Sequence, residues 1–461
     1  MSWTQQNEYW RRPLDCHDRL FQHIAAAGQP LGREHWLMIG TAQLVLPHMD
    51  AECEKEKRLR QAWAALRLRH PDIAIELHHQ EKRYVPVTHA ESLSEWAEKT
   101  FKVETTVTSA DELFSRRLRF TEASATCYWI PSSSELGIVA SHWQWDGRGL
   151  LMMLHEFLDV LTTHNFDGAT PVSCQSTSSE VARLVPSLDA LMNVPDTPSK
   201  ECLSQAEAML APVKAEPASI GLPIKTGSLP GDTSRLDTIL SHEETAALLA
   251  ACRVRGTRLT AALHASIIVE TARAQSQERP AESLYKSWAA FDLRKYCPPP
   301  FDGPAHAPSL RMVALPLVVD ASADWDTLLT LLQPVYRQSF APEDGELMMV
   351  RVPYVEKATA LLAEAVPTTE PNLSNVGTLD NYVRAEYGDI RVNNVWLAVH
   401  MLSPQLYVHA WSWKRQLHLS VCYNESFYDA AFVEQWVANV KMNLFVNLSI
   451  KVPVQHSKEM R

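Results

Sequence analysis

The chain has 461 residues, of which 46% are hydrophobic, so it can bury large cores and is not a disordered chain. At about 100–200 residues per domain, this length predicts two or three domains. The formal net charge is −11, from 54 acidic and 43 basic residues. With no basic block in the sequence, this balance argues against a nucleic acid as a partner.

The cysteines and the first residues of the chain indicate the cellular compartment of the protein. No C-x-x-C pair and no Cys/His cluster at zinc spacing occurs, which predicts a reduced protein without a metal. Residues 1–12 are polar and lack the apolar core of a secretory signal, and no window approaches the ~20 apolar residues of a membrane span. We expect a cytoplasmic monomer. The eight cysteines are Cys16, Cys53, Cys127, Cys174, Cys202, Cys252, Cys297 and Cys422.

The first half of the chain predicts a mixture of strands and helices. Residues 1–35 are polar and are expected to be irregular. Hydrophobic periodicity then predicts the elements that follow. They are a strand over 36–46, a helix over 51–69, strands over 73–79 and 84–87, a short helix over 91–99, and a hairpin of 126–130 with 136–140.

The hairpin is followed by a seven-residue stretch, Ser141-His142-Trp143-Gln144-Trp145-Asp146-Gly147. An apolar run of helical length, 150–161, comes next, so the stretch is a strand-to-helix turn. A turn held by packed elements can aim a histidine into a cleft, and an imidazole with a pKa of about 6.5 exchanges protons near neutral pH. A lone histidine at a strand end is more often a core residue, and Asp146 could simply cap the helix. The residues alone leave both interpretations open.

Residues 165–235 have a different composition, with eight of the 28 prolines between Pro171 and Pro230. They retain apolar residues, which predicts a packed crossover between two domains, with helices near 179–192 and 204–210. The second half then predicts helices, strands and a meander. They are helices over 243–253 and 261–273, the second capped by Thr260, strands over 283–291 and 310–319, a helix over 325–333, a meander over 395–402, 406–413 and 417–423, and a helix over 428–448.

The spacing H-x-x-x-D-G from His142 to Gly147 resembles the H-H-x-x-x-D-G signature of the chloramphenicol acetyltransferase-like superfamily, with Ser141 in place of the first histidine. That superfamily includes CoA-dependent acyltransferases of plants and fungi and peptide-synthetase condensation domains. The D-F-G-W-G motif of the plant members is absent. Three further segments match the superfamily in the same order along the chain. Thr260 to Ala265 resembles the helix start that opens the second half in this superfamily, and Phe291-Asp292-Leu293-Arg294 resembles its D-L-R segment. Ser374-Asn375-Val376-Gly377 resembles the S-N-x-G turn of the fungal members.

The resemblance implies an α/β (α+β) fold of two chloramphenicol acetyltransferase-like domains, each a mixed sheet flanked by helices, with the active-site channel between them. The expected parts are a domain over 1–180 that carries the motif, a crossover over 181–225 and a domain over 226–461. The resemblance also implies a site without a metal ion and a role for each of several residues. They are His142 as the catalytic base, Asp146 and Arg294 as an ion pair that supports the motif, and Ser374, Asn375 and Gly377 as a substrate or oxyanion turn.

More closely, the chain resembles the fungal trichothecene 15-O-acetyltransferases. This implies acetyl-CoA as co-substrate and the C-15 hydroxyl of a sesquiterpenoid mycotoxin precursor as acceptor, in secondary metabolism. His142 would take the hydroxyl proton while the oxygen attacks the thioester in a ternary complex. One alternative is a condensation-type acyltransferase with a carrier-bound donor. Another is a non-catalytic binding protein of the same fold, against which His142, Asp146 and Arg294 count.

Overall fold

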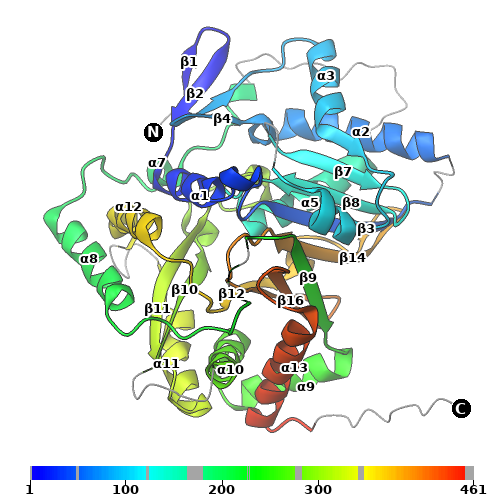
Figure 1. Cartoon of the computed structure of the whole chain (residues 1–461). Helices are drawn as coiled ribbons and strands as arrows, with labels where there is room; N and C mark the ends of the chain where they lie inside the picture. The colour runs from blue at the N-terminus through cyan, green and yellow to red at the C-terminus, as the bar shows by residue number, and fades with distance from the viewer. Residues whose placement is uncertain are drawn as a thin grey trace, which may run out of the picture.

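Four β-sheets and the helices that cover them organise the chain in the computed structural model, which describes residues 3–47, 51–120, 124–163, 180–225, 227, 229–275, 283–340 and 347–451. The first half lies above the second in Figure 1, and each half combines sheets with helices. The strand orders within the described residues are β1-β2-β5-β4, β13-β14-β3-β8-β7-β6, β10-β11 and β12-β15-β16-β9.

The first half follows most of the expected pattern. Its helices are α1 Cys16–Ala26, α2 Glu52–Arg69, α3 Ala90–Thr100, α4 Ala110–Glu112 and α5 Gly147–Thr163. Its strands are β1 Thr4–Gln6, β2 Tyr9–Pro13, β3 Met38–Val45, β4 Glu76–His78, β5 Glu81–Tyr84, β6 Phe101–Val103, β7 Thr126–Ile130 and β8 Glu135–Ala140.

The expected hairpin is confirmed, because β7 pairs antiparallel with β8, and β8 continues the sheet into β3. The helix that follows the motif, α5, is apolar nearly all round and is correspondingly central. Eleven of its residues are buried, from Gly149 to Leu161. Burial of such a helix against β3 and α2 fixes the first turn of α5, and with it the loop that precedes it.

Two expectations for the first half were wrong. Residues 1–35 are not irregular, because they form β1, β2 and α1. Helix α1 starts at a capping box, in which Asp15 accepts from the N–H of Asp18 while the Asp18 side chain accepts from the N–H of Asp15. The strand expected over 73–79 begins instead with a 3-10 turn, Pro71–Ala74, and only Glu76–His78 pairs, with β5.

The crossover packs on the second half rather than running free. It contains α7 Leu188–Leu191, within the helix expected near 179–192, and α8 Lys200–Lys214; residue 179 lies outside the described residues. Leu188, Cys202 and Leu210 join a cluster with Val313 of β11 and Tyr354 of α12.

The second half contains five helices and eight strands in the described residues. The helices are α9 His242–Val254, α10 Leu259–Ala274, α11 Trp325–Arg337, α12 Leu347–Glu364 and α13 Ala430–Asn447. The strands are β9 Thr233–Ile239, β10 Leu284–Asp292, β11 Met312–Asp320, β12 Asn372–Thr378, β13 Glu386–Tyr387, β14 Ile390–Val399, β15 Tyr407–Trp413 and β16 Gln416–Asn424.

The expected three-stranded meander is wrong in its first strand. Strands β15 and β16 pair as expected, but β14 leaves them and pairs antiparallel with β3, in the sheet of the first half. In Figure 1, β14 lies beside β3 while β16 lies in the lower half. The boundaries 1–180, 181–225 and 226–461 therefore remain a prediction, and β13 and β14 of the last segment complete the sheet of the first.

The start of α10, the cysteines and the length of the helices can also be compared with the expectations from the sequence. Thr260 does not cap α10, which starts after Arg258 without a side-chain cap. The seven described cysteines are free, and Cys174 lies outside the described residues. Among the described helices, none is both long enough and apolar enough to cross a membrane.

Candidate active site

The loop between β8 and α5 carries the motif and is tied down along its whole length. The hydroxyl of Ser141 donates to Glu34 at 3.0 Å, and the N–H of Gln144 donates to the carbonyl of Ser141 at 3.0 Å. The Gln144 side chain donates to the carbonyl of Ile75 at 3.3 Å. Trp145 is fully buried in the core of the first half. These contacts leave the loop little freedom, which is what a positioned catalytic side chain requires.

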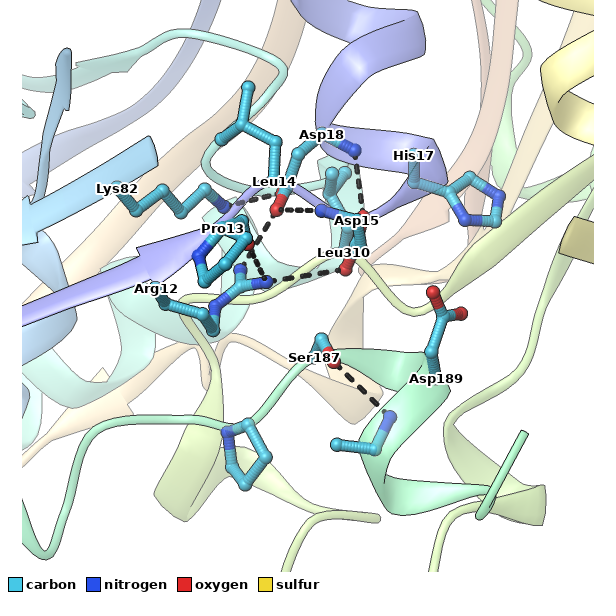
Figure 2. A network of polar contacts seen from close by, with 12 residues as sticks. Arg12, Pro13, Leu14, Asp15, His17, Asp18, Lys82, Ser187, Asp189 and Leu310 are labelled. Atoms are coloured by element: carbon cyan, nitrogen blue, oxygen red, sulfur yellow. Dashed lines mark hydrogen bonds and ion pairs between the residues drawn. The ribbon is translucent and has the colours of Figure 1, made fainter. Parts of the chain in front are cut away.

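A network of charged side chains contacts the loop, and Figure 2 shows its members Arg12, Asp18 and Lys82. The ammonium of Lys82 lies 2.6 Å from a carboxylate oxygen of Asp18 and also donates to the carbonyl of Trp143 at 3.1 Å. Arg12 reaches the same carboxylate of Asp18 at 2.9 Å. The hollow that these groups line has a volume of about 30 Å³, which is room for water rather than for a metabolite.

The imidazole of His142 is packed between aromatic rings. It stacks on Phe21 of α1, with centroids 4.0 Å apart and planes within 3°, and its centroid lies 5.8 Å from that of Trp36. Trp36 has a φ of 61°, a left-handed conformation that a bulky residue rarely adopts. Strain of this kind concentrates at functional sites, so Trp36 is held here by its surroundings.

The protonation state of His142 follows from its environment. Burial lowers the pKa of the ring to about 4, against opposing effects from its own backbone carbonyl and from the charge of Asp146. Nδ1 is buried without a hydrogen-bond partner of good geometry in the described residues. A neutral imidazole at neutral pH has one nitrogen with a free lone pair, which is the form a general base needs.

The carboxylate of Asp146 is saturated with hydrogen bonds. Oδ1 accepts from the N–H of Gly149 at 2.8 Å and lies 2.9 Å from Nη2 of Arg294. Oδ2 accepts from Nη1 of Arg294 at 2.9 Å and from the N–H of Arg311 at 2.8 Å. The expected contact of Asp146 with Arg294 is present, together with the helix cap that was its alternative. Nearby positive groups and N–H donors outweigh burial and lower the pKa of Asp146.

The ion pair extends to two further residues that the sequence did not single out. Asp292 accepts from Arg294 at 3.0 Å through Oδ1 and lies 2.8 Å from Nη1 of Arg148 through Oδ2. Arg148 follows the motif glycine, so it could be found from its place, whereas Asp292 is the first residue of the D-L-R segment. Two carboxylates and two guanidinium groups thus alternate, which offsets the cost of burying each charge.

Close packing explains one glycine of α5. A Cβ on Gly149 would lie 2.6 Å from the carbonyl oxygen of Ala307 and 3.1 Å from Nη2 of Arg294. Any side chain there would push Arg294 away from Asp146. The glycine therefore allows the helix start to approach the second half closely enough for the ion pair to form.

His142 borders a cavity of about 90 Å³ between the two halves. This free volume is below the ~300 Å³ of typical ligand sites, so a ligand of ordinary size would require the lining side chains to move. Apolar side chains form much of the wall, and the charged groups Asp146, Arg148, Asp292 and Arg294 of the ion-pair network also line it beside His142. The first half and β14 contribute Trp36, Met38, Leu397, Ala398 and Val399; the second half contributes Ala290, Phe291, Met312, Ser374, Asn375, Val376, Tyr407 and His409.

The segment Ser374 to Gly377 is not a turn but lies within β12, which is bulged between Asn375 and Gly377. The Asn375 amide maintains this bulge, because it donates to Thr260 at 2.7 Å and accepts from the N–H of Gly377 at 2.9 Å. Gly377 has a φ of 93°, which favours glycine. Ser374 and Asn375 line the cavity with His142, and their part in oxyanion binding stays a prediction.

Sequence reasoning missed the aromatic and polar side chains that surround His142. Phe21 lies in the segment expected to be irregular, and no pattern in that segment singled it out. Tyr407 and His409 alternate along β15, and this period of two could have placed them on one face of the strand. Among the described residues, no group of three or more His, Cys, Asp or Glu could hold a metal ion.

Comparisons with known proteins agree with this geometry, although no protein-family model matches the chain. The acetyltransferase pigO of Monascus ruber is 27% identical over 466 residues, with 98% of this chain and 99% of that protein covered. The O-acetyltransferase pigM of the same fungus is 27% identical, over 98% of this chain and 88% of that protein. The solved trichothecene 15-O-acetyltransferase of Fusarium sporotrichioides covers 97% of both chains at 14% identity, with a TM-score of 0.82.

The chain has the chloramphenicol acetyltransferase-like fold. The predicted resemblance and the predicted fold class are therefore confirmed. The two relatives from Monascus ruber, each matched over 98% of this chain, are named acetyltransferases, and the chain is an acyltransferase. The cavity beside His142 is lined by residues of both halves, which is where the channel was expected.

Removal of either partner of the buried ion pair should destabilise the protein. Asp146→Asn or Arg294→Leu leaves a buried charge with fewer partners, and each should lower the free energy of unfolding by about 3–5 kcal/mol. The double variant should lose less than the sum of the two single variants, because the groups interact. Urea unfolding followed by circular dichroism measures all three.

A matched control for that prediction is the exposed pair of Arg19 with Glu356, which also joins distant parts of the chain at 2.7 Å. Arg19→Leu should cost at most about 1 kcal/mol, since solvent screens the pair. Single variants of Asp146 and Arg294 no more damaging than this control would contradict the prediction.

Lys82 should act on the reaction rate through the loop. Lys82→Met removes the donor to the Trp143 carbonyl next to His142 and leaves Asp18 paired with Arg12. We expect kcat to fall about tenfold with KM nearly unchanged, because a misplaced base mainly affects the chemical step. Lys99→Met, on an exposed position of α3, should leave both constants unchanged. A rise in KM without a change in kcat would contradict this role.

Proposed function

We propose that the protein transfers the acetyl group of acetyl-CoA to a hydroxyl of a secondary metabolite, with His142 as general base. The observation that carries the proposal is the neutral, half-buried imidazole of His142, held in a fixed loop at the wall of a mainly apolar cavity. Relatives named acetyltransferases support the reaction type.

The proposed step is a direct transfer within a ternary complex. His142 removes the proton of the acceptor hydroxyl as the oxygen attacks the thioester carbonyl, and the new C–O bond forms. The C–S bond then breaks, and His142 returns the proton to the sulfur of CoA. A positioned base contributes about 10²–10⁴-fold to such a reaction. Asp146 and Arg294 do not touch the substrate in this scheme; they hold the loop that carries His142.

The apolar side chains in the cavity wall indicate which class of alcohol could be the acceptor. Trp36, Met38 and Leu397 on one side and Phe291 and Met312 on the other favour a molecule with an apolar frame. The C-15 hydroxyl of a trichothecene precursor belongs to this class, and we propose it as the first acceptor to test. We also propose a cytoplasmic location, which agrees with the free thiols of the described cysteines.

The proposal predicts CoA release that depends on both an alcohol and His142. Wild-type protein with acetyl-CoA and a panel of terpenoid alcohols, including a trichothecene with a free C-15 hydroxyl, should release thiol that a colorimetric reagent detects. His142→Ala should lose about 10²–10⁴-fold in kcat while it stays folded by circular dichroism. Turnover of free acetyl-CoA also separates this reaction from transfer out of a carrier protein.

The control variant is His418→Ala, because His418 is a buried histidine on β16 that does not line the cavity. It should retain most of the activity. Near-normal turnover by His142→Ala with a good acceptor would exclude the mechanism, whereas turnover of other alcohols but not of the trichothecene would exclude only that acceptor.

The low pKa of His142 predicts how the rate depends on pH. Because burial lowers this pKa to about 4, the ring stays neutral, and able to accept a proton, well below the ordinary value of 6.5. The acidic limb of kcat/KM, which reports the free enzyme, should therefore fall between pH 5 and 4, with about half the activity left near pH 4. Circular dichroism at each pH separates this loss from unfolding. An acidic limb with a midpoint at 6.5 or above would contradict it.

A further inference from the structure

A row of polar side chains crosses the sheet of the second half where that sheet faces the cavity. Ser374 of β12 is the register partner of His409 on β15, and His409 is the register partner of Ser420 on β16. Residues paired in this way point to the same face of a sheet. Ser374 and His409 line the cavity together with Tyr407, which precedes His409 by two residues on the same face.

His409 is buried and has no partner. It is 2% exposed, and neither ring nitrogen makes a hydrogen bond to a described residue; Nδ1 is fully buried. The hydroxyl of Ser420 beside it is also buried and unpartnered. Each unsatisfied buried polar group costs about 1–3 kcal/mol, so the protein retains these groups at a cost that a bound polar atom would remove.

The rings around His409 connect it to the catalytic histidine. The Tyr407 centroid lies 4.9 Å from that of His409 and 5.3 Å from that of Trp36, which in turn lies 5.8 Å from that of His142. Trp36 belongs to the first half and His409 to the second, so the two histidines face one cavity from opposite halves. A molecule that fills this cavity beside His142 therefore also borders Tyr407 and His409.

Both side chains are hydrogen-bond donors at neutral pH. Burial lowers the pKa of His409 to about 3, and the charge of a protonated His142 adds to this effect, so the ring is neutral and carries one N–H. Burial raises the pKa of Tyr407 to about 12, so its hydroxyl keeps its proton. The guanidinium groups of Arg148 and Arg294, which also line the cavity, are already paired with Asp292 and Asp146. A carbonyl oxygen can accept from the two neutral donors, Tyr407 and His409, at once.

We propose that Tyr407 and His409 form an oxygen-binding subsite, which takes a carbonyl oxygen of the alcohol substrate, remote from the hydroxyl that His142 deprotonates. The subsite rests on the proposed function and specifies the acceptor class as keto-alcohols with an apolar frame. Contacts with the apolar walls bind the carbon frame of the substrate but do not fix its orientation. The carbonyl bound at Tyr407 and His409 orients the molecule so that one hydroxyl meets His142.

Binding without acetyl-CoA tests the subsite independently of catalysis. The probes are 1-decalol and isomeric hydroxydecalones that carry a ketone at different ring positions, and isothermal titration calorimetry gives each Kd. Wild-type protein should bind at least one hydroxydecalone about tenfold more tightly than 1-decalol, as a neutral hydrogen bond allows. Tyr407→Phe and His409→Phe should each reduce this ratio, and the double variant should bring it to about one.

Two controls keep the result interpretable. His418→Phe makes the same substitution on the same sheet, outside the cavity, and should keep the wild-type ratio. His409→Gln keeps a side-chain donor and should restore part of the preference that His409→Phe loses. Thermal unfolding followed by circular dichroism shows which variants are folded. The KM for acetyl-CoA should not change in a folded variant, since the subsite binds the acceptor.

Two outcomes overturn the inference. One is that wild-type protein binds none of the hydroxydecalones more tightly than 1-decalol. A result in which no hydroxydecalone binds measurably counts as this outcome. The other is that the preference survives in folded Tyr407→Phe/His409→Phe protein. Failure of the proposed function gives a different result. The His142→Ala variant would then keep normal turnover of acetyl-CoA and alcohol, whereas wild-type protein would still prefer the ketone and the double variant would still lose this preference.

Discussion

The site depends on one carboxylate. Asp146 receives hydrogen bonds from the start of α5, from the guanidinium of Arg294 and from the backbone of Arg311, which lie 3, 148 and 165 residues away. A buried charge is tolerated only when its partners are in place, so the loop, the D-L-R segment and β11 must assemble together. The loop that carries the motif in the first half is thus fixed by the second half.

The side chain of His142 packs against two aromatic rings, and Lys82 holds the loop that carries it. Phe21 covers one face of its ring, Trp36 lies at its edge, and Lys82 holds the carbonyl of the next residue. Phe21 is itself placed by α1, whose capping box uses Asp18, the residue that Lys82 also contacts. The charged groups drawn in Figure 2 therefore affect the position of His142 indirectly, because they hold both α1 and the loop that carries His142.

The sequence predicted what local patterns specify. The hairpin of β7 and β8, the motif between β8 and α5, and the buried character of α5 follow from periodicity, and the resemblance supplied Arg294 as the partner of Asp146. The position of α1 was missed because its charged first turn, with Asp15 and Asp18, resembles a polar loop unless the capping box is recognised. Strand β14 was misplaced because an apolar strand does not encode which sheet it joins, and the meander was inferred from adjacency along the chain alone.

The departure of β14 from its neighbours also explains why a cavity exists at all. Strands β14 and β15 are separated by seven residues, yet β14 pairs with β3 in one sheet and β15 with β12 and β16 in another. Residues 397–399 of β14 form part of one wall, and Tyr407 and His409 of β15 part of the other. Had the three strands formed a meander, these faces would lie side by side on a continuous sheet. Because the strands part, residues of the two sheets line one cavity from different sides, and His142 borders it.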